Sequence, residues 1–185
     1  MGKVAWGAMF RSDRLPLHPL VLTAVYLIAA AGPIFLASGL AAPDLVFALM
    51  LFAGFLQVTW ILHVGRYAIS RMEKHAGVDE RLRRRTRLMF GAASGIAISI
   101  FLAVIVCWLF LTPNPQTGAY DNPWVMPIVL GIFASGFTLI FQAAKALCEA
   151  ESKNTGERIF VTVLRFFYIV IGAPFIYRRL KRLPA

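Results

Sequence analysis

A few polar side chains in otherwise apolar runs are the residues of this chain whose type suits chemistry. Gln57, His63 and Gln142 stand inside such runs, and His18 stands just before the first one. An imidazole that faces a pocket can be an axial ligand of haem. Polar side chains on neighbouring membrane helices can also line a path for ions or solutes. The sequence therefore raises two hypotheses, haem bound through His63 or His18 and a polar path along Gln57, His63 and Gln142.

Both hypotheses lack the partners that they require. Neither histidine has a second one in its own run, and the chain contains no Cys-x-x-Cys-His motif. No apolar run has an aspartate or glutamate near its middle, so the carboxylate on which proton relays and cation-coupled transporters depend is missing. His63 can instead form a hydrogen bond near a membrane interface with Gln57 or Tyr67. We therefore expect no cofactor, and a small oligomeric channel or transporter is the alternative function.

The acidic residues do not form a catalytic pair. Asp44 and Asp121 fall in two separate turns, and Glu149 and Glu151 are two positions apart in a predicted helix, which directs them to different sides. Gly-x-Ser-x-Gly, His-Glu-x-x-His and phosphate-binding motifs are missing from the sequence. The two cysteines are too few for a metal site or a disulfide framework. We therefore predict a non-enzymatic protein without catalytic residues or a bound metal.

Long apolar runs must position these residues. The chain has 185 residues, of which 59% are hydrophobic, whereas soluble domains are nearer to about half. Runs long enough to cross a bilayer predict four transmembrane helices at about residues 20–40, 45–64, 88–111 and 125–147. The predicted fold class is an all-α polytopic membrane protein, a four-helix bundle over residues 20–147. An arm over residues 1–19 precedes the bundle, and residues 148–185 follow it.

The basic residues predict the orientation of the bundle. None of the 19 lysines and arginines falls in residues 41–44 or 112–124, the predicted outer loops. They lie in the arm, in the loop 65–87 and from the end of the fourth run onward, and membrane proteins keep such residues on the cytoplasmic side. Both termini and the loop are therefore predicted to face the cytoplasm, in the inner membrane of a bacterium. Because this topology accounts for the net charge of +10, we expect no nucleic-acid partner.

The interpretation of the tail determines whether four or five transmembrane helices are predicted. Residues 159–177 are apolar enough for a fifth span, but Arg165 interrupts them, and a charge in the middle of a bilayer costs at least about 2.5 kcal/mol. A fifth crossing would also carry the closing basic residues to the outer side. We predict instead an amphipathic or re-entrant helix from Glu157 to Arg182, bent near Gly172 and Pro174. A true fifth span is the alternative.

The tail resembles the C-terminus of a group of small bacterial membrane proteins of uncharacterised function. Those proteins end with a helix that contains alanine and glutamate, a phenylalanine-rich stretch, and a segment close to Pro-Ile-Gly-x-Trp-Phe-Ile-Gln-Pro-Arg-Leu/Ile-Asn. The matching residues here are Ala144, Leu147, Glu149, Phe160, Phe166, Phe167, Ile171, Gly172, Phe175, Ile176, Arg179 and Leu180. Val170, Pro174 and Tyr177-Arg178 depart from the pattern. The resemblance covers about the last quarter of the chain and implies a cytoplasmic-side C-terminal module, but no activity.

Interaction with lipid or protein is the function class that remains. Anionic lipid gains roughly 1 kcal/mol for each basic residue held near its surface. We predict that residues of the loop and the tail make such contacts: Arg81, Arg83, Arg84, Arg85, Arg87, Phe160, Phe166, Phe167, Phe175, Arg178, Arg179, Lys181 and Arg182. Small residues, Gly91, Gly95, Gly131 and Ser135, predict close helix packing in the bundle or in a homo-oligomer. The predicted function is a membrane subunit, anchor or scaffold whose basic face binds anionic lipid or a protein partner.

Overall fold

The computed structural model describes residues 16, 18–39, 43–74, 79–110, 125–151 and 156–183. Its helices are α2 (Pro19–Ala37), α3 (Pro43–Lys74), α4 (Glu80–Phe110), α5 (Val125–Ala150), α6 (Gly156–Phe167) and α7 (Ile169–Lys181). No strand occurs among the described residues, which confirms the all-α class for that part of the chain. Most of the predicted arm and the predicted outer loop 112–124 lie outside the described residues.

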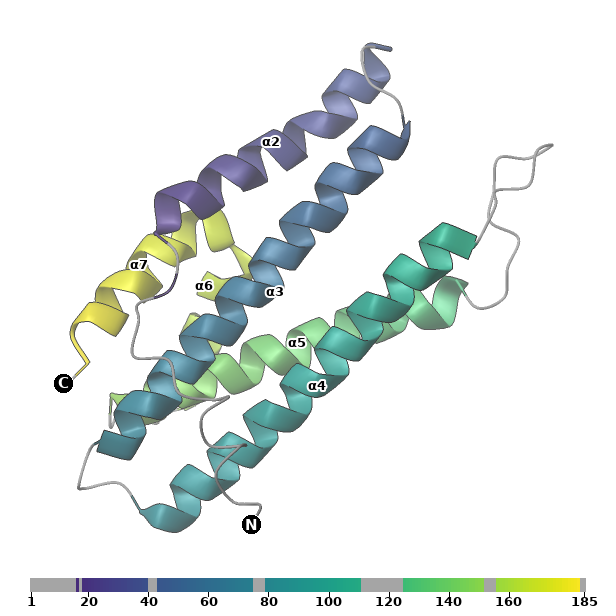
Figure 1. Cartoon of the computed structure of the whole chain (residues 1–185). Coiled ribbons are helices and arrows are strands. Elements are labelled where there is room, and N and C mark those ends of the chain that lie inside the picture. The colour runs from purple at the N-terminus through teal and green to yellow at the C-terminus, as the bar shows by residue number, and fades with distance from the viewer. Residues whose placement is uncertain are drawn as a thin grey trace.

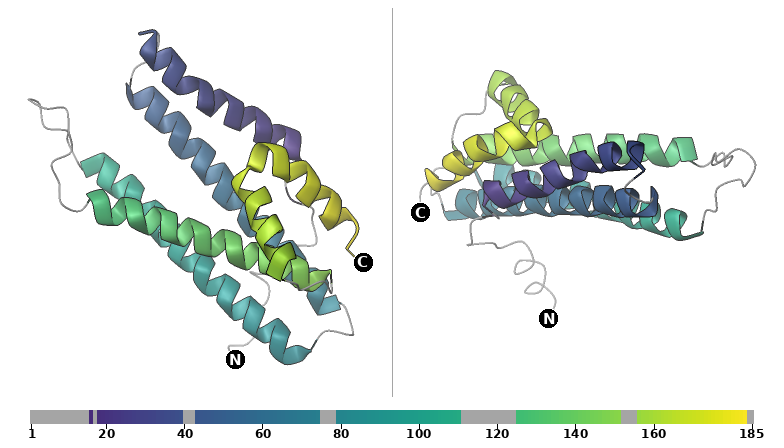
Figure 2. Two further views of the ribbon diagram at one scale, coloured as in Figure 1. Left: turned by 180° about the vertical axis from the view of Figure 1, so that it is seen from behind. Right: turned by 90° about the horizontal axis from the view of Figure 1, so that it is seen from above.

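The four long helices, α2 to α5, run alternately up and down the molecule (Figure 1). α2 lies beside α3, α4 lies beside α5, and α5 also packs along α3. The end of the molecule at which α3 ends, α4 begins and α5 ends is here called the basic end, because the last turns of α3 and the first turns of α4 are rich in arginine. Toward the opposite end, here called the splayed end, α3 diverges from α4 and α5 in Figure 1 and in the rear view of Figure 2.

The hydrophobic core lies toward the basic end and not at the middle of the bundle. Val64 of α3, Phe90 of α4 and Leu147 of α5 have no exposed surface. Near the splayed end, by contrast, large apolar side chains such as Ile34 and Phe133 are 71% and 72% exposed. A surface in water seldom presents many large apolar side chains together. The outer halves of the long helices therefore suit apolar surroundings.

Two helices are long and apolar enough to cross a membrane, judged by length and composition. They are Glu80–Val106 of α4 and Leu130–Ala150 of α5. Within the described residues, α2 contributes a shorter apolar stretch, Pro19–Ala29. α3 continues beyond the predicted end of its span at residue 64 as far as Lys74. The structure thus shows a helical protein with two candidate spans, and the complete set of four spans stays a prediction.

The last two helices form a hairpin instead of the single bent helix predicted for Glu157 to Arg182. The chain turns at Tyr168, whose carbonyl oxygen accepts a hydrogen bond from the Gly172 N–H at 2.7 Å. Gly172 lies directly against the backbone of Arg165 in α6, where a Cβ would overlap the Arg165 carbonyl group. The turn therefore lies at Tyr168, before the bend predicted near Gly172 and Pro174. Gly172 does not bend the helix but allows α7 to approach the backbone of α6 closely.

The hairpin packs against the longer helices with its tip directed away from the basic end (Figure 2). α6 packs on α5, and α7 packs on α2 and α3. Phe166 of α6 is fully buried against Trp60 of α3, with the ring centroids 5.7 Å apart. Both open ends of the hairpin lie nearer the basic end than the turn between α6 and α7 does. The hairpin thus extends from near the basic end partway toward the splayed end, and α7 then runs back toward the basic end.

Candidate functional surfaces at the basic end and inside the bundle

The arginines at the start of α4 divide between two faces of the helix. Arg87 forms an ion pair with Glu73 of α3, and Arg83 Nη1 donates a hydrogen bond to the Glu73 carbonyl oxygen at 3.3 Å. The exposed members are Arg81, Arg84 and Arg85. The helical repeat produces this division, because residues three or four positions apart share a face. Arg83 and Arg87 thus hold α4 to α3, and the other three remain at the surface.

Arg179 of α7 lies in a network that joins three helices. Its Nε and Nη2 donate hydrogen bonds to the two carboxylate oxygens of Glu151, which follows α5, each at 2.7 Å. Its Nη1 donates to the Thr162 hydroxyl of α6 at 2.7 Å, and Nη2 lies 3.6 Å from the Cys148 sulfur of α5. A bidentate arginine–carboxylate pair fixes orientation as well as distance. This set of contacts, here called the Arg179 network, fastens the hairpin to the end of α5.

These contacts stabilise the charged form of Arg179. Burial alone lowers the pKa of the guanidinium, but hydrogen bonds and Coulomb attraction from Glu151 and Cys148 outweigh that effect. The pKa of Arg179 is therefore raised above its ordinary value. Since ordinary arginine is already charged at any physiological pH, the network keeps its cation throughout that range.

Glu149 faces α4 and not α7. One of its carboxylate oxygens accepts a hydrogen bond from the Thr86 hydroxyl at 2.5 Å. The other oxygen makes no hydrogen bond and lies 3.8 Å from the Lys145 ammonium nitrogen. Glu149 is 3% exposed, so this contact is part of the packed core between α4 and α5. Glu149 and Glu151 thus take different partners, as expected from their spacing, but no pattern in the sequence pointed to Thr86.

The phenylalanines of the tail also divide between core and surface. Phe166 is fully buried, so it belongs to the core and not to the contact surface predicted for it. Phe160, Phe167 and Phe175 are exposed on the hairpin. The Phe175 ring also lies under the Arg165 guanidinium, at 5.3 Å from its centroid. Three of the four predicted phenylalanines thus remain available to a partner.

The basic residues at the open ends of the hairpin are exposed. Those predicted from the sequence are Arg178, Lys181 and Arg182 at the end of α7. Lys181 also lies over the Tyr177 ring, at 5.0 Å from its centroid. Arg158 in the first turn of α6 is exposed as well, although it was not among the contact residues predicted from the sequence. Both helices of the hairpin thus carry exposed cations at the ends that lie away from the turn.

One residue of the predicted polar path lines the apolar cavity of the bundle, and the other two lie elsewhere. Gln57 lines the cavity described below, and its side-chain oxygen accepts a hydrogen bond from the Tyr26 hydroxyl of α2. Gln142 is buried and His63 is half-buried, but neither lines that cavity. His18 lies beside Tyr177, with the ring centroids 5.3 Å apart. Within the described ranges, no group of three or more His, Cys, Asp or Glu side chains could hold a metal ion.

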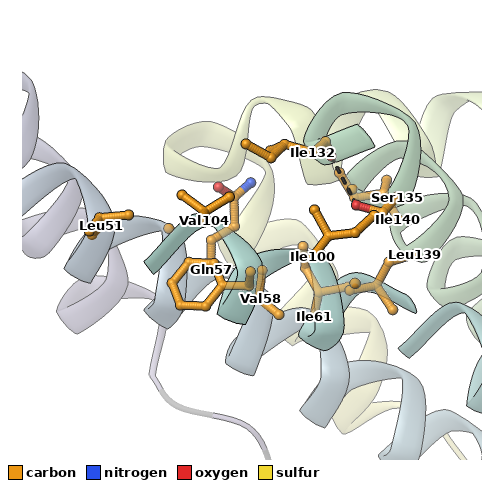
Figure 3. A pocket seen from close by; sticks show the side chains of 14 residues that line it. Leu51, Gln57, Val58, Ile61, Ile100, Val104, Ile132, Ser135, Leu139 and Ile140 are labelled. Atoms are coloured by element: carbon orange, nitrogen blue, oxygen red, sulfur yellow. Dashed lines mark hydrogen bonds between the residues drawn. The ribbon is translucent and has the colours of Figure 1, made fainter. Parts of the chain in front are cut away.

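An apolar cavity of about 370 Å³ lies among α3, α4 and α5 (Figure 3). Aliphatic and aromatic side chains form most of its wall, and Gln57 and Ser135 are its polar side chains. The Ser135 hydroxyl donates to the Ile132 carbonyl oxygen of its own helix at 3.1 Å. The cavity therefore presents hydrocarbon almost everywhere, with one amide on the α3 side.

A close contact between α3 and α4 involves a glycine that the small-residue pattern had not indicated. Gly65 of α3 lies against the Phe90 ring of α4, where a Cβ would overlap the ring. Gly95, predicted to pack, has nothing within 4 Å of the place a Cβ would take. Gly131 has its nearest neighbouring atom at 3.7 Å from that place, and Gly91 is half-buried. The described chain thus uses Gly65 for close approach and leaves Gly95 uncovered.

Comparison of the chain with protein-family models, with curated proteins and with solved structures finds no match in any of the three. The resemblance of the tail to small bacterial membrane proteins therefore stays an expectation from the sequence. The exposed cations at the basic end and the apolar cavity are the features of the described chain that best suit a ligand.

Proposed function

We propose that this protein is a non-enzymatic component of a bacterial inner membrane, a subunit, anchor or scaffold that binds anionic lipid through its basic end. The observation that supports this most directly is the division of the cations into two sets. Arg87 and Arg179 form internal ion pairs, whereas Arg81, Arg84 and Arg85 are exposed at the same end of the bundle. Exposed cations next to apolar helices suit the headgroup layer of a cytoplasmic leaflet.

Four spans account for the lengths of the long helices. α2 has 19 residues and no charged side chain, and its length of about 28 Å is close to the roughly 30 Å of a hydrocarbon core. α3 is uncharged from Leu45 to Gly65. α4 and α5 each contain a stretch that is long and apolar enough to cross. In this placement, the large apolar side chains exposed near the splayed end contact lipid tails.

Ring contacts give the depth of the hairpin in this placement. Phe167 lies 6.0 Å from Phe137 of α5, between ring centroids, and about 12 Å of helix separates Phe137 from Lys145. Phe166 lies against Trp60, and about 9 Å of helix separates Trp60 from Arg66. Both measures put the tip of the hairpin roughly 10 Å inside the level of the cytoplasmic cations.

The proposed hairpin is therefore re-entrant, entering one leaflet without crossing. α6 has 12 residues, which is about 18 Å of helix and too short for a span of roughly 30 Å. Tyr168 and Ile171 at the tip are each 68% exposed, which suits contact with lipid tails. In this placement, the cations at the open ends lie at the same headgroup level as those of α4. The basic end and the hairpin thus present one lipid-binding face to the same leaflet.

Neutralising the exposed arginines of α4 tests this proposal. The variant Arg81→Gln/Arg84→Gln/Arg85→Gln removes three charges but leaves the Arg87 and Arg179 ion pairs intact. At roughly 1 kcal/mol for each basic residue, we expect its affinity for phosphatidylglycerol to fall about a hundredfold. Titration of the detergent-solubilised protein with a fluorescent phosphatidylglycerol, followed by anisotropy, measures this change.

The matched control keeps the charges and changes the side chains. Arg81→Lys/Arg84→Lys/Arg85→Lys is expected to bind within a few fold of the unaltered protein at low salt, and both are expected to weaken as salt screens the charges. Fluorescent phosphatidylcholine, which has no net charge, reports binding through the tails alone. Equal affinity of the glutamine variant and the unaltered protein for phosphatidylglycerol would refute the proposal.

A further inference from the structure

We propose that the cavity among α3, α4 and α5 holds one acyl chain of a phospholipid from the outer leaflet. The inference rests on the membrane placement proposed above, but it concerns a different part of the molecule from the basic end. Its basis is the cavity itself, about 370 Å³ in volume and walled by three helices. That volume falls within the range of about 300–1,000 Å³ typical of ligand sites.

The cavity is long in the direction of the helices. On α3 it extends from Leu51 to Ile61, about 15 Å of helix, and on α5 from Ile132 to Ile140, about 12 Å. Its inner limit at Ile61 lies only about 8 Å of helix from Arg66, and the rest extends toward the splayed end. An elongated space at the middle of the proposed spans, parallel to them and open toward the splayed end, suits a lipid tail that descends from the outer headgroups.

The wall of the cavity is continuous with the apolar outer surface. Ile132, which lines the cavity, is itself 39% exposed. Phe101 of the cavity wall packs against the exposed Phe55 of α3, with the ring centroids 6.0 Å apart. Figure 3 shows side chains of three helices around the cavity, and Figure 1 shows α3 diverging from α4 and α5 toward the splayed end. In a bilayer, the hydrocarbon that covers the outer surface therefore has direct access to the cavity.

The polar atoms of the cavity are too few for water. A buried water needs about two to four polar partners. The Ser135 hydroxyl bonds to its own helix, and the Gln57 oxygen bonds to Tyr26, which leaves the Gln57 amide nitrogen. A chain of methylene groups needs no such partners and gains contact with the aliphatic wall. Hydrocarbon is therefore the occupant that this lining fits.

Photolabelling in vesicles tests the inference. The full chain is reconstituted in phosphatidylcholine and phosphatidylglycerol with a phosphatidylcholine that carries a diazirine in the middle of one acyl chain. After illumination, mass spectrometry locates the labelled residues. We expect labelling to be enriched several-fold at Leu51, Val104 and Ile132 over lipid-facing residues such as Ile34 and Phe133.

Two glycines provide a matched pair of variants. Gly136 lines the cavity and Gly95 lies on α4 outside its lining, and neither has an atom within 4 Å of the place a Cβ would take. Gly136→Leu fills the cavity and is expected to reduce labelling of Val104 several-fold, whereas Gly95→Leu adds the same side chain and is expected to leave it unchanged. Labelling of Phe133 in each variant reports that the bundle remains inserted.

A third variant separates a lipid tail from a polar ligand. Gln57→Leu removes the one side-chain amide of the cavity wall. An acyl chain is expected to bind this variant as it binds the unaltered protein. Loss of labelling in Gln57→Leu would overturn the inference in favour of a ligand that the amide recognises. Labelling spread evenly over all lipid-facing residues, equal labelling of Gly136→Leu, or cross-linking of a second copy of the chain at the cavity would each overturn it as well.

The outcomes also separate this inference from the proposed function. Labelling of Ile34 and Phe133 without enrichment at the cavity would refute only the acyl-chain site. No labelling of any helix would refute the membrane placement on which both depend. The binding of phosphatidylglycerol by the exposed arginines of α4 is measured independently and does not involve the cavity.

Discussion

Five arginines lie between Arg81 and Arg87, and their neighbours decide what each one does. Arg83 and Arg87 contact Glu73 of α3. Arg81, Arg84 and Arg85 are exposed on the surface of α4. The sequence alone predicts that all five gather at one end. It does not predict which of them turn inward, because the acidic partner belongs to another helix and the rotation of α4 against α3 selects it. The same holds for Arg179, whose partner Glu151 lies 28 positions earlier.

Arg179→Met is expected to destabilise the hairpin by about 2–3 kcal/mol. Removing one partner from a fully buried ion pair costs about 3–5 kcal/mol. Here the Arg179 and Glu151 side chains keep 17% and 16% of their surface exposed, which places the cost at or below the lower limit. Thermal unfolding of the detergent-solubilised protein, compared with that of the unaltered chain, measures the change.

The neighbouring position supplies the control for this prediction. Arg178→Met removes the same charge from an exposed site and is expected to change stability by less than about 0.5 kcal/mol. Arg179→Met/Glu151→Leu removes both charges and is expected to recover part of the loss. Because the pKa of Arg179 is raised, its stabilising contribution is present below the ordinary arginine range and disappears only above it. The difference between the two single variants is therefore expected not to change with pH near neutrality, and equal melting of both would contradict the role of the Arg179 network.

At the scale of elements, the sequence pattern of the tail predicts that it does not cross the membrane, but it does not predict where the tail turns. Arg165 and the closing cations predict a tail that does not cross, and the hairpin is consistent with that. The position of the turn was not predictable from Gly172, because a glycine can serve either a bend or a close contact, and here it contacts the Arg165 backbone. Likewise, the spacing of Gly91 and Gly95 suggested close packing, but α3 and α4 approach closely where Gly65 meets the Phe90 ring.

Cysteine labelling tests the re-entrant placement of α6 and α7. In a background with Cys107→Ser and Cys148→Ser, single cysteines are placed at Glu157, Tyr168 and Lys181. A membrane-impermeant maleimide is expected to label Glu157→Cys and Lys181→Cys from the side of the basic end only. Tyr168→Cys is expected to stay unlabelled from either side until detergent is added, because its place is among lipid tails.

The alternatives for the tail predict different labelling. A fifth span would expose Lys181→Cys on the side opposite to Glu157→Cys. A helix pair that lies on the membrane surface would leave Tyr168→Cys as reactive as Lys181→Cys in intact vesicles. Either result would also separate the closing cations, or the hairpin tip, from the lipid-binding face proposed here.

At the scale of the whole molecule, the packed core is displaced toward one end. Composition and the distribution of charge predict helices, their approximate limits and the end at which cations gather. They do not predict that α3 diverges from α4 and α5 toward the splayed end, because apolar residues that face lipid and apolar residues that face each other look alike in a sequence. Phe90 and Phe133 illustrate this: both lie in apolar runs, yet one is fully buried and the other is 72% exposed.

The displaced core predicts an uneven response to removal of the bilayer. Amide hydrogen exchange is expected to speed up in α2 and in the outer halves of α3 to α5 when lipid vesicles are replaced by a mild detergent. The segments around Val64, Phe90 and Leu147 are expected to keep their protection, because protein and not lipid surrounds them. Mass spectrometry of peptides from both preparations measures the difference, and a uniform change along the helices would contradict it.

The turn at Tyr168 has a consequence for how the chain is inserted into the membrane. Because α7 runs from the turn back toward the basic end, its C-terminal cations Arg178, Lys181 and Arg182 stay on the side from which the hairpin starts. In the proposed placement, no cation after the fourth span has to be transferred across the bilayer. The last two helices can then be inserted after synthesis has finished, by their own apolar tip, without a secretion channel or a membrane potential to move charge outward.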